Sequence, residues 1–285
     1  MDVLFFDADN NYYSSEDVRR ALIETGAADC ETLFIHADVM FGRPPEGFRR
    51  KEYLAVLYEI IASLGVRNLI VPTFTYSFCN HECYDIVNSK TSMGAFNEYI
   101  RKLPGRYRTF DPLLSVSVPA HMETQFNHVS DHSLGEGSAL DILHHMDGVK
   151  FLFFGAEMAE CFTYVHYVEK MLDVPYRFDM PFEGEIILPD RSTVQRKQFI
   201  HTQCGGVRLP PKYTYFEAEM EERGFLKKKR LADKYIACLS EPDAYREIKG
   251  HIEDNIYYFL EVPYEKSQLT HCYTYSTDKG RITHC

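Results

Sequence analysis

The chain has 285 residues, 45% of them hydrophobic, which is enough for one large domain or two small ones with a sizeable core. No apolar run reaches the length of a membrane span, and the first residues are acidic where a signal peptide would be basic, so we predict a cytoplasmic protein with no membrane partner. The formal net charge of -11 argues against a nucleic-acid partner and favours amine-bearing ligands.

The first part of the chain alternates between strand and helix patterns. Residues 2–9 form a candidate edge strand, and Ser14 to Asp17 match a capping box at the start of a helix. Short apolar runs at 31–36 and 68–73 predict buried strands, and the apolar spacing between them predicts a crossover helix. This alternation predicts an α/β fold with a mostly parallel central sheet flanked by helices.

A third buried strand, at 150–154, is followed by a break at Gly155 and then by a helix pattern. The strand is a short apolar run without polar alternation, which is typical of a strand buried on both faces. The three predicted strands end in His36, Thr73 and Gly155, so these residues should share one edge of the sheet. Ligands of α/β proteins bind at that edge, where strands end and helices begin.

His166 lies in the first turn of the helix that follows Gly155, with Thr163 as the candidate N-cap. The positive end of a helix dipole disfavours a charged imidazole, so the ring is expected to be neutral and able to accept a proton. Glu169, three residues later, lies on the same helix face and can orient the ring. Spacing alone favours the commoner alternative of a packed or surface histidine.

The second half of the chain adds a hairpin and further helices. An antiparallel hairpin around residues 189–190 is predicted to extend the sheet at its edge. The last hundred residues are predicted to be mostly helical, with Ser240 as the N-cap of one helix. Without repeats or linkers, the sequence predicts a single α/β domain over 1–285, with a core at about 14–200 and a helical C-terminal part at about 212–262.

Cysteines offer other chemical centres. Cys79, His81 and Cys83 are candidate zinc ligands, although no second pair stands at a standard spacing. Cys161, close to His166 in the sequence, is a candidate nucleophile on proximity alone. The 8 cysteines have no disulfide framework and are expected to be reduced thiols.

Two basic runs are candidate anion sites. The run at 49–51 precedes a predicted helix near the ligand edge of the sheet, which makes it the better candidate for binding phosphate. The run at 227–230 is predicted to be the solvated face of a helix.

Several segments resemble, in the same order, those of the aminoglycoside 3-N-acetyltransferase family, the antibiotic N-acetyltransferases that use acetyl-CoA. The segments are LFIHADV, IVPTFTYSF, TSMGAFNEYIRKLPGRYRTFDPLLSVSV, HSLGEGSALDIL and FLFFGAEMAECFTYVHYVEKMLDVP. They cover most of residues 14–180, and the third and the last are the most specific. The resemblance implies the fold of that family and an acetyl-CoA-dependent N-acetyltransferase for which no metal is expected.

The resemblance also implies roles for individual residues. His166, in TYVHYVE, matches the catalytic general base of the family, and Glu169 matches the acidic residue that follows it. Residues expected to contact acyl-CoA are Ala37, Asp38, Thr73, Phe74, Thr75, Ser115 and Val116.

The expected acceptor is a small sugar that carries an amine. Candidate contacts to its cationic or hydroxyl groups are Glu136, Glu157, Thr163 and Glu183, and for the acids a solvent-facing position is an equally good interpretation. Asp111 stands where antibiotic-modifying members have His, and the spelling of several segments resembles a branch found with sugar- and surface-polysaccharide-modifying genes. The resemblance therefore favours an amino sugar over an antibiotic, and a homodimer is compatible with the sequence.

Two other functional classes stay open. A zinc-dependent hydrolase would use Cys79, His81 and Cys83, and the metal content of the purified protein would reveal it. A non-catalytic ligand-binding relative would bind acetyl-CoA without turnover.

Overall fold

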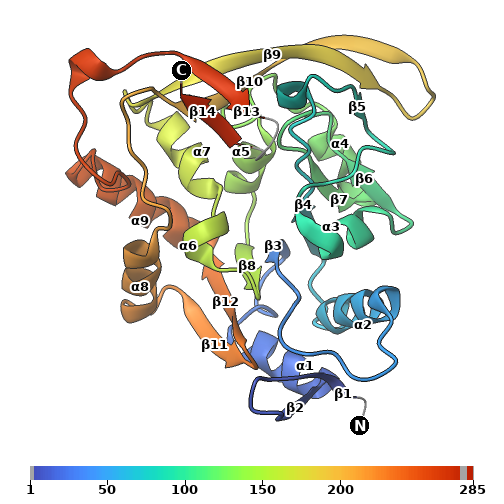
Figure 1. The fold of residues 1–285 in the computed structure, drawn as a ribbon. Coiled ribbons are helices and arrows are strands. Elements are labelled where there is room, and N and C mark those ends of the chain that lie inside the picture. Colours follow the sequence, from blue (N-terminus) through green and yellow to red (C-terminus); the bar gives the residue numbers. More distant parts are fainter. Residues whose placement is uncertain (1–2, 277–280, 285) are drawn as a thin grey trace.

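The central element of the fold is a seven-stranded sheet in the order β11-β12-β8-β3-β4-β7-β6 (Figure 1). The computed structural model describes residues 3–276 and 281–284. Strand β3 (Thr32–Ala37) pairs in parallel with β4 (Asn68–Pro72) on one side and with β8 (Val149–Phe154) on the other. The three predicted buried strands are confirmed as the parallel centre of the sheet.

Antiparallel strands extend this centre on both sides. On one side, β12 (Lys234–Ser240) pairs with β8, and β11 (Lys227–Leu231) pairs with β12. On the other, β7 (Val116–Pro119) pairs with β4, and β6 (Arg106–Arg108) pairs with β7. The predicted fold class, a central sheet flanked by helices with an antiparallel edge extension, is confirmed.

Helices cover both faces of the sheet. Successive residues of a strand point to opposite faces, so each central strand contributes side chains to two cores. Leu33 and Ile35 belong to the core on one face, and Phe34 belongs to the core on the other. The helices of the first face are α1 (Ser15–Glu24), α2 (Arg50–Ala62) and α3 (Gly94–Arg101). The main helices of the second face are α5 (Ala139–His144), α7 (Tyr164–Met171) and α9 (Glu241–Asp254). Burial on both sides explains why the central strands are continuous apolar runs.

Further elements lie between and around these layers. They are η1 (Phe78–Asn80), η2 (Ala120–Met122), α4 (Glu123–Phe126), α6 (Met158–Cys161), α8 (Thr214–Glu222), η3 (Lys266–Gln268), and the paired strands β13 (Tyr273–Ser276) and β14 (Arg281–His284).

Strand β1 (Val3–Phe6), the predicted edge strand, pairs with β2 (Tyr12–Ser14) in a separate two-stranded sheet, and its Phe6 forms an isolated bridge to Arg43. The capping box that follows is confirmed. The Ser14 hydroxyl accepts a hydrogen bond from the Asp17 N–H, and the Asp17 carboxylate accepts one from the Ser14 N–H at 2.9 Å.

The predicted hairpin is confirmed, but its position is corrected. Strands β9 (Arg177–Ile187) and β10 (Thr193–Gln203) pair antiparallel over their whole length. They form a separate sheet with β5 (Tyr84–Asp85) instead of extending the central sheet, whose edges are taken by β11 and β6. In Figure 1 this hairpin arches over the ends of α7 and η1 at the top of the molecule.

The segment 212–262 was predicted to be helical, but it is helical only in part. It holds α8 and α9, but β11 and β12 lie between them. The basic run at 227–230 therefore lies on an edge strand, not on a helix. Lysines on an edge strand hinder pairing with a further strand, which is a structural reason for their presence. Ser240 is the N-cap of α9, as predicted.

The prediction that all cysteines are reduced thiols is wrong for Cys272, which forms a disulfide bond just before β13. Sequence spacing gave no sign of this bond. The free cysteines among the described residues are Cys30, Cys79, Cys83, Cys161, Cys204 and Cys238. Within the same residues, none of the helices has the length and apolar character needed to cross a bilayer.

Gly155 generates a stability prediction. Its φ is +74°, and a Cβ there would collide with the Asp38 carbonyl oxygen. We expect Gly155→Ala to lower the free energy of unfolding by about 2 to 5 kcal/mol, since left-handed strain adds to overpacking. Gly224→Ala is the matched control, because Gly224 has a φ of +77° but no atom within 4 Å of the point that a Cβ would occupy. Equal losses for the two variants in urea unfolding would contradict the steric argument.

Candidate functional site

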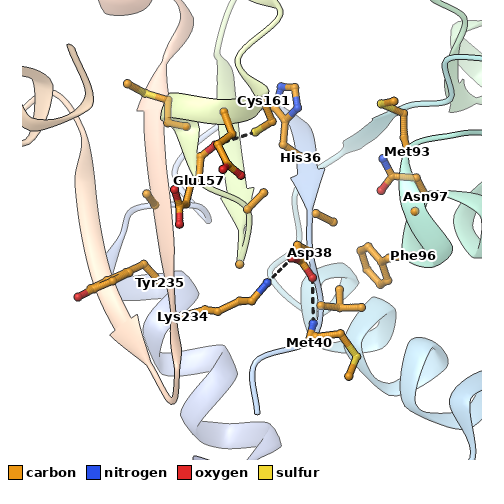
Figure 2. A pocket seen from close by; sticks show the side chains of 18 of the residues that line it. His36, Asp38, Met40, Met93, Phe96, Asn97, Glu157, Cys161, Lys234 and Tyr235 are labelled. Carbon is orange, nitrogen blue, oxygen red and sulfur yellow. Dashed lines mark hydrogen bonds and ion pairs between the residues drawn. The ribbon is translucent and has the colours of Figure 1, made fainter. Parts of the chain in front are cut away.

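A cavity of about 990 Å³ lies at the C-terminal ends of β3 and β8 (Figure 2). Much of its wall comes from three segments: residues 36–40 at and beyond the end of β3, residues 155–161 after β8, and residues 93–97 at the start of α3. The start of α2, Pro72, residues of β11 and β12 with the turn between them, and one side of α8 also contribute. The predicted ligand edge of the sheet is therefore hollow, and His36 and Gly155 both lie there as expected.

The lysines in this cavity are held by carboxylates. Lys234 forms an ion pair with Asp38, whose carboxylate also accepts a hydrogen bond from the Met40 N–H (Figure 2). Lys228 lies 2.7 Å from a Glu217 oxygen. Arg50, the first residue of α2, also lines the cavity, so the preferred basic run of the sequence does reach the ligand edge.

A histidine–carboxylate pair, of which only the carboxylate is fully buried, lies on α7. The side chains of His166 and Glu169 meet because they are three residues apart on one helix, and their Nδ1 and Oε2 atoms are 2.8 Å apart. Glu169 is fully buried, accepts a hydrogen bond from the Tyr176 hydroxyl at 2.9 Å, and forms an ion pair with Arg177 at 2.6 Å. His166 lies in the first helical turn as predicted, but the Thr163 side chain makes no capping hydrogen bond.

The charges around this pair set its protonation. Burial alone would raise the pKa of Glu169, but the Arg177 guanidinium and the hydrogen bonds from His166 and Tyr176 hold that pKa at about 2. Burial lowers the pKa of His166, and the nearby positive charge of Arg177 lowers it further. His166 Nδ1 faces both Glu169, which can only accept a hydrogen bond, and Arg177, which can only donate one. The tautomer that satisfies the buried carboxylate carries its proton on Nδ1; Arg177 then makes no hydrogen bond to the ring, and Nε2 keeps a lone pair. The side chain is 29% exposed, so an acceptor molecule can reach the ring.

The β9–β10 hairpin supplies groups that the sequence analysis did not assign. Arg177 is the first residue of β9, and its Nη2 lies 2.9 Å from His166 Nδ1. Asp179 accepts hydrogen bonds from Lys170 of α7 at 2.6 Å and from His201 of β10 at 2.9 Å. The only sequence signal for Arg177 and Asp179 is their spacing: two residues apart on a strand that follows the His166 helix, they point to the same face.

Three of the predicted ligand contacts line the cavity: Ala37, Asp38 and Glu157. Thr73, Phe74, Ser115 and Val116 are instead buried in the core and are not part of its wall. Their predicted contact with the acyl donor stays a prediction.

The hydroxyls of Thr73 and Ser115 serve a buried arginine. Arg108 donates from Nη2 to the Thr73 carbonyl oxygen at 2.7 Å and from Nε towards both hydroxyls at 3.2 Å. Thr75 is partly buried and donates to the Pro112 carbonyl oxygen at 2.8 Å. This network ties the loop after β4 to β6 and β7, so these residues have a structural role.

The remaining acceptor candidates lie on the surface. Glu183 is 73% exposed in the middle of β9, where it faces Lys197 at 3.7 Å. Glu136 is exposed in the loop before α5, next to Gly135, which lies against His132 and Lys170. The loop therefore brings Glu136 towards the α7 surface, whereas Glu183 lies further along the hairpin.

The cysteine alternatives gain no support. Burial raises the pKa of the Cys79 thiol to about 12, while Cys83 is exposed. Among residues 3–276 and 281–284, no three or more His, Cys, Asp or Glu side chains are placed to hold a metal ion. Burial also raises the pKa of the Cys161 thiol, so it is a poor nucleophile.

These features define an α/β protein with a cavity at its strand ends and a histidine–glutamate pair on α7, the helix that follows α6 in the chain; α6 contributes to the wall of that cavity, and His166 is not among the residues that line it. Residues 49–253 match the aminoglycoside 3-N-acetyltransferase family. The chain therefore belongs to this family, and the resemblance seen in the sequence is confirmed. No curated protein matches the chain significantly.

Solved structures show the same fold. The aminoglycoside acetyltransferase AAC(3)-Xa has a TM-score of 0.70 at 18% identity, over 85% of this chain and 93% of that chain. AAC-IIIb, in a binary complex with CoASH, has a TM-score of 0.68 at 18% identity, over 89% and 99%. The YokD protein from Bacillus subtilis has a TM-score of 0.66 at 15% identity, over 85% and 94%. Identities this low establish the fold and no more.

Replacing Arg177 with Met should raise the pKa of His166, because a positive charge is removed from beside the ring while Glu169 remains. The ring would then become charged at a higher pH than in the wild type. An NMR titration of the imidazole protons measures this pKa directly. Arg177→Lys, which keeps the charge, should give a smaller rise.

Arg191→Met is the control for this titration, because Arg191 is exposed and pairs with Asp85 on the distant end of the hairpin. An unchanged His166 pKa in Arg177→Met would show that Arg177 does not set the protonation of the ring.

Proposed function

We propose that this protein is an acetyl-CoA-dependent N-acetyltransferase that acts on an amine of an amino sugar or an aminoglycoside-like acceptor. The observation that carries the proposal is the His166–Glu169 pair, which leaves Nε2 of a neutral ring free to accept a proton. Family membership gives the reaction class. Similar folds have been solved with CoASH, with sisomicin and, as a histidine-to-alanine mutant, with a gentamicin.

The cavity is the proposed site of the acyl donor. Its volume suits a cofactor-sized ligand, and Met40, Met93 and Phe96 give it an apolar side against which a pantetheine arm can pack (Figure 2). Arg50 at the start of α2 is the proposed partner of a donor phosphate. The thioester end then lies towards Cys161, in the segment that leads into α7.

The reaction needs one base and no covalent intermediate on the protein. His166 removes a proton from the acceptor ammonium group, and the free amine attacks the thioester carbonyl carbon. The tetrahedral intermediate loses the CoA thiolate as the amide forms. The protonated His166 gives its proton to the departing thiolate, takes up the second proton from the nitrogen and releases it to solvent, so the products are an N-acetyl amine, CoA thiol and one proton. Glu169 keeps the ring oriented and stabilises its charged form.

The acceptor is the less defined partner. The net charge of -11 favours a cationic molecule. Glu157 is the candidate that lines the cavity, and Thr163 lies between it and His166 along the chain. Glu136 is a further candidate contact near α7. An amino sugar, free or nucleotide-linked, is the proposed acceptor class.

Replacing His166 with Ala should lower turnover by about 10² to 10⁴-fold, the usual contribution of a positioned general base. The measurement is a free-thiol assay with acetyl-CoA against amino sugars, nucleotide-linked amino sugars and aminoglycosides. His145→Ala is the matched control, because His145 is 70% exposed on α5 and should be dispensable. Near-wild-type turnover by His166→Ala on the best acceptor would exclude the proposed base.

A further inference from the structure

His36 is a buried imidazole in the wall of the cavity. It lies near the C-terminal end of β3, is only 6% exposed, and is one of the residues that line the cavity; its ring points to the Cys161 end of the view in Figure 2. Aromatic rings surround it: Phe153 stacks nearly parallel at 5.4 Å, and Phe34 and Phe162 contact it edge-on at 5.2 and 6.4 Å. A phenylalanine would fit this aromatic surrounding as well as a histidine does.

The polar atoms of the ring have no partner within the protein. None of the described residues forms a hydrogen bond with either ring nitrogen, and burial alone lowers the pKa of His36 to about 3. Neither ring nitrogen is among the fully buried unpartnered atoms of the described residues, and His36 lines the cavity. The neutral ring keeps one N–H, so its partner comes from whatever fills the cavity, water or a ligand.

Neighbouring charged groups are all directed elsewhere. Asp38 is held by Lys234, and Glu157 is held by Lys212 at 2.7 Å. The Cys161 thiol donates to the Glu157 carbonyl oxygen at 3.1 Å. His36 therefore has no acidic partner. Because burial lowers its pKa, the ring stays neutral near neutral pH, and His36 enters the proposal as a hydrogen-bond donor and not as a second base.

A second polar side chain in the same wall also lacks a partner. Asn97 is 1% exposed, and its amide nitrogen donates to the Pro72 carbonyl oxygen at 2.9 Å. Its Oδ1 atom has no hydrogen-bond partner among the described residues. That oxygen is itself fully buried and is not open to the cavity, so of the two side chains only His36 can offer a polar atom to a ligand there.

We propose that His36 is a catalytic residue whose ring N–H donates a hydrogen bond to the thioester carbonyl oxygen of the acyl donor. This inference rests on the proposed acetyltransferase function. When the amine attacks the carbonyl carbon, the C=O π electrons move to the oxygen, and the N–H of His36 stabilises the resulting negative charge. No proton leaves His36: the amine protons pass through His166, and the bond that breaks is the carbon–sulfur bond.

Burial suits His36 to this role. A neutral imidazole stays a hydrogen-bond donor at physiological pH without adding a charge, as an electrophilic histidine must. A hydrogen bond to a developing charge stabilises it more in a site with few competing polar groups than in water. Phe162, which packs on His36, lies four residues before His166, so one short segment positions both the proposed donor of this hydrogen bond and the proposed base.

Three variants of His36 test the proposal. His36→Phe keeps the aromatic packing but removes the N–H, and turnover should fall about 10² to 10³-fold, as for loss of one oxyanion-stabilising donor. The affinity for CoA, which has no thioester carbonyl, should stay within about twofold, and the midpoint of thermal unfolding should be unchanged or higher. His36→Gln and His36→Asn place an N–H near Nε2 and Nδ1 respectively, and the one that matches the donating nitrogen should recover part of the turnover.

A His36→Phe variant with turnover within about fivefold of wild type would overturn the proposal, since one donor to a developing oxyanion is worth more than that. So would a fall in turnover that is matched by an equal loss of CoA affinity or by a large loss of stability, since either indicates a structural role.

A spectroscopic measurement separates this inference from the proposed function. In ¹⁵N-labelled wild-type protein, acetyl-CoA should shift the ring signals of His36 in a way that CoA does not. If wild-type protein transfers no acetyl group to any acceptor, the proposed function is wrong, and with it the catalytic role of His36, whereas this signal still tests the hydrogen bond from His36 to the thioester. Identical ring signals with acetyl-CoA and CoA would overturn the hydrogen bond to the carbonyl oxygen even if turnover is high.

Discussion

The ion pair between Glu169 and Arg177 is the interaction on which the rest of the site depends. Glu169 is fully buried on α7, and an isolated charge there would be unfavourable. Arg177, from the first residue of β9, compensates that charge, and the Tyr176 hydroxyl satisfies the other carboxylate oxygen. The ionised carboxylate in turn fixes the His166 ring. The hairpin and the helix therefore have to be assembled together before the proposed base is formed.

The sheet and the cavity follow from the same local arrangement. Parallel strands β3 and β8 end side by side, and both chains leave the sheet there, which opens a space that side chains do not fill. Gly155 permits the sharp exit from β8 with a φ of +74°. The connection from β8 to α7 thus forms one wall of the cavity and then places His166, while His36 is supplied by the neighbouring strand β3.

Local sequence patterns predicted much of this arrangement, and long-range contacts account for what they missed. The buried strands, the capping box and the His166–Glu169 pair depend on residues close in sequence, so their spacing was informative. The partnership of Arg177 with Glu169 and the burial of Thr73 and Ser115 around Arg108 depend on how distant segments meet. Strand β11 was missed because a run of lysines lacks the apolar alternation of a half-buried strand and is typical only of an edge.

The paired lysines of the cavity have a consequence for how a donor is recognised. Lys234 and Lys228 already face Asp38 and Glu217, so little of their positive charge is available to attract a polyanion from a distance. The acyl donor would then be recognised mainly through contacts made inside the cavity, not through attraction at a distance. Capture of the donor should in that case vary little with ionic strength, unlike association that is steered by long-range fields.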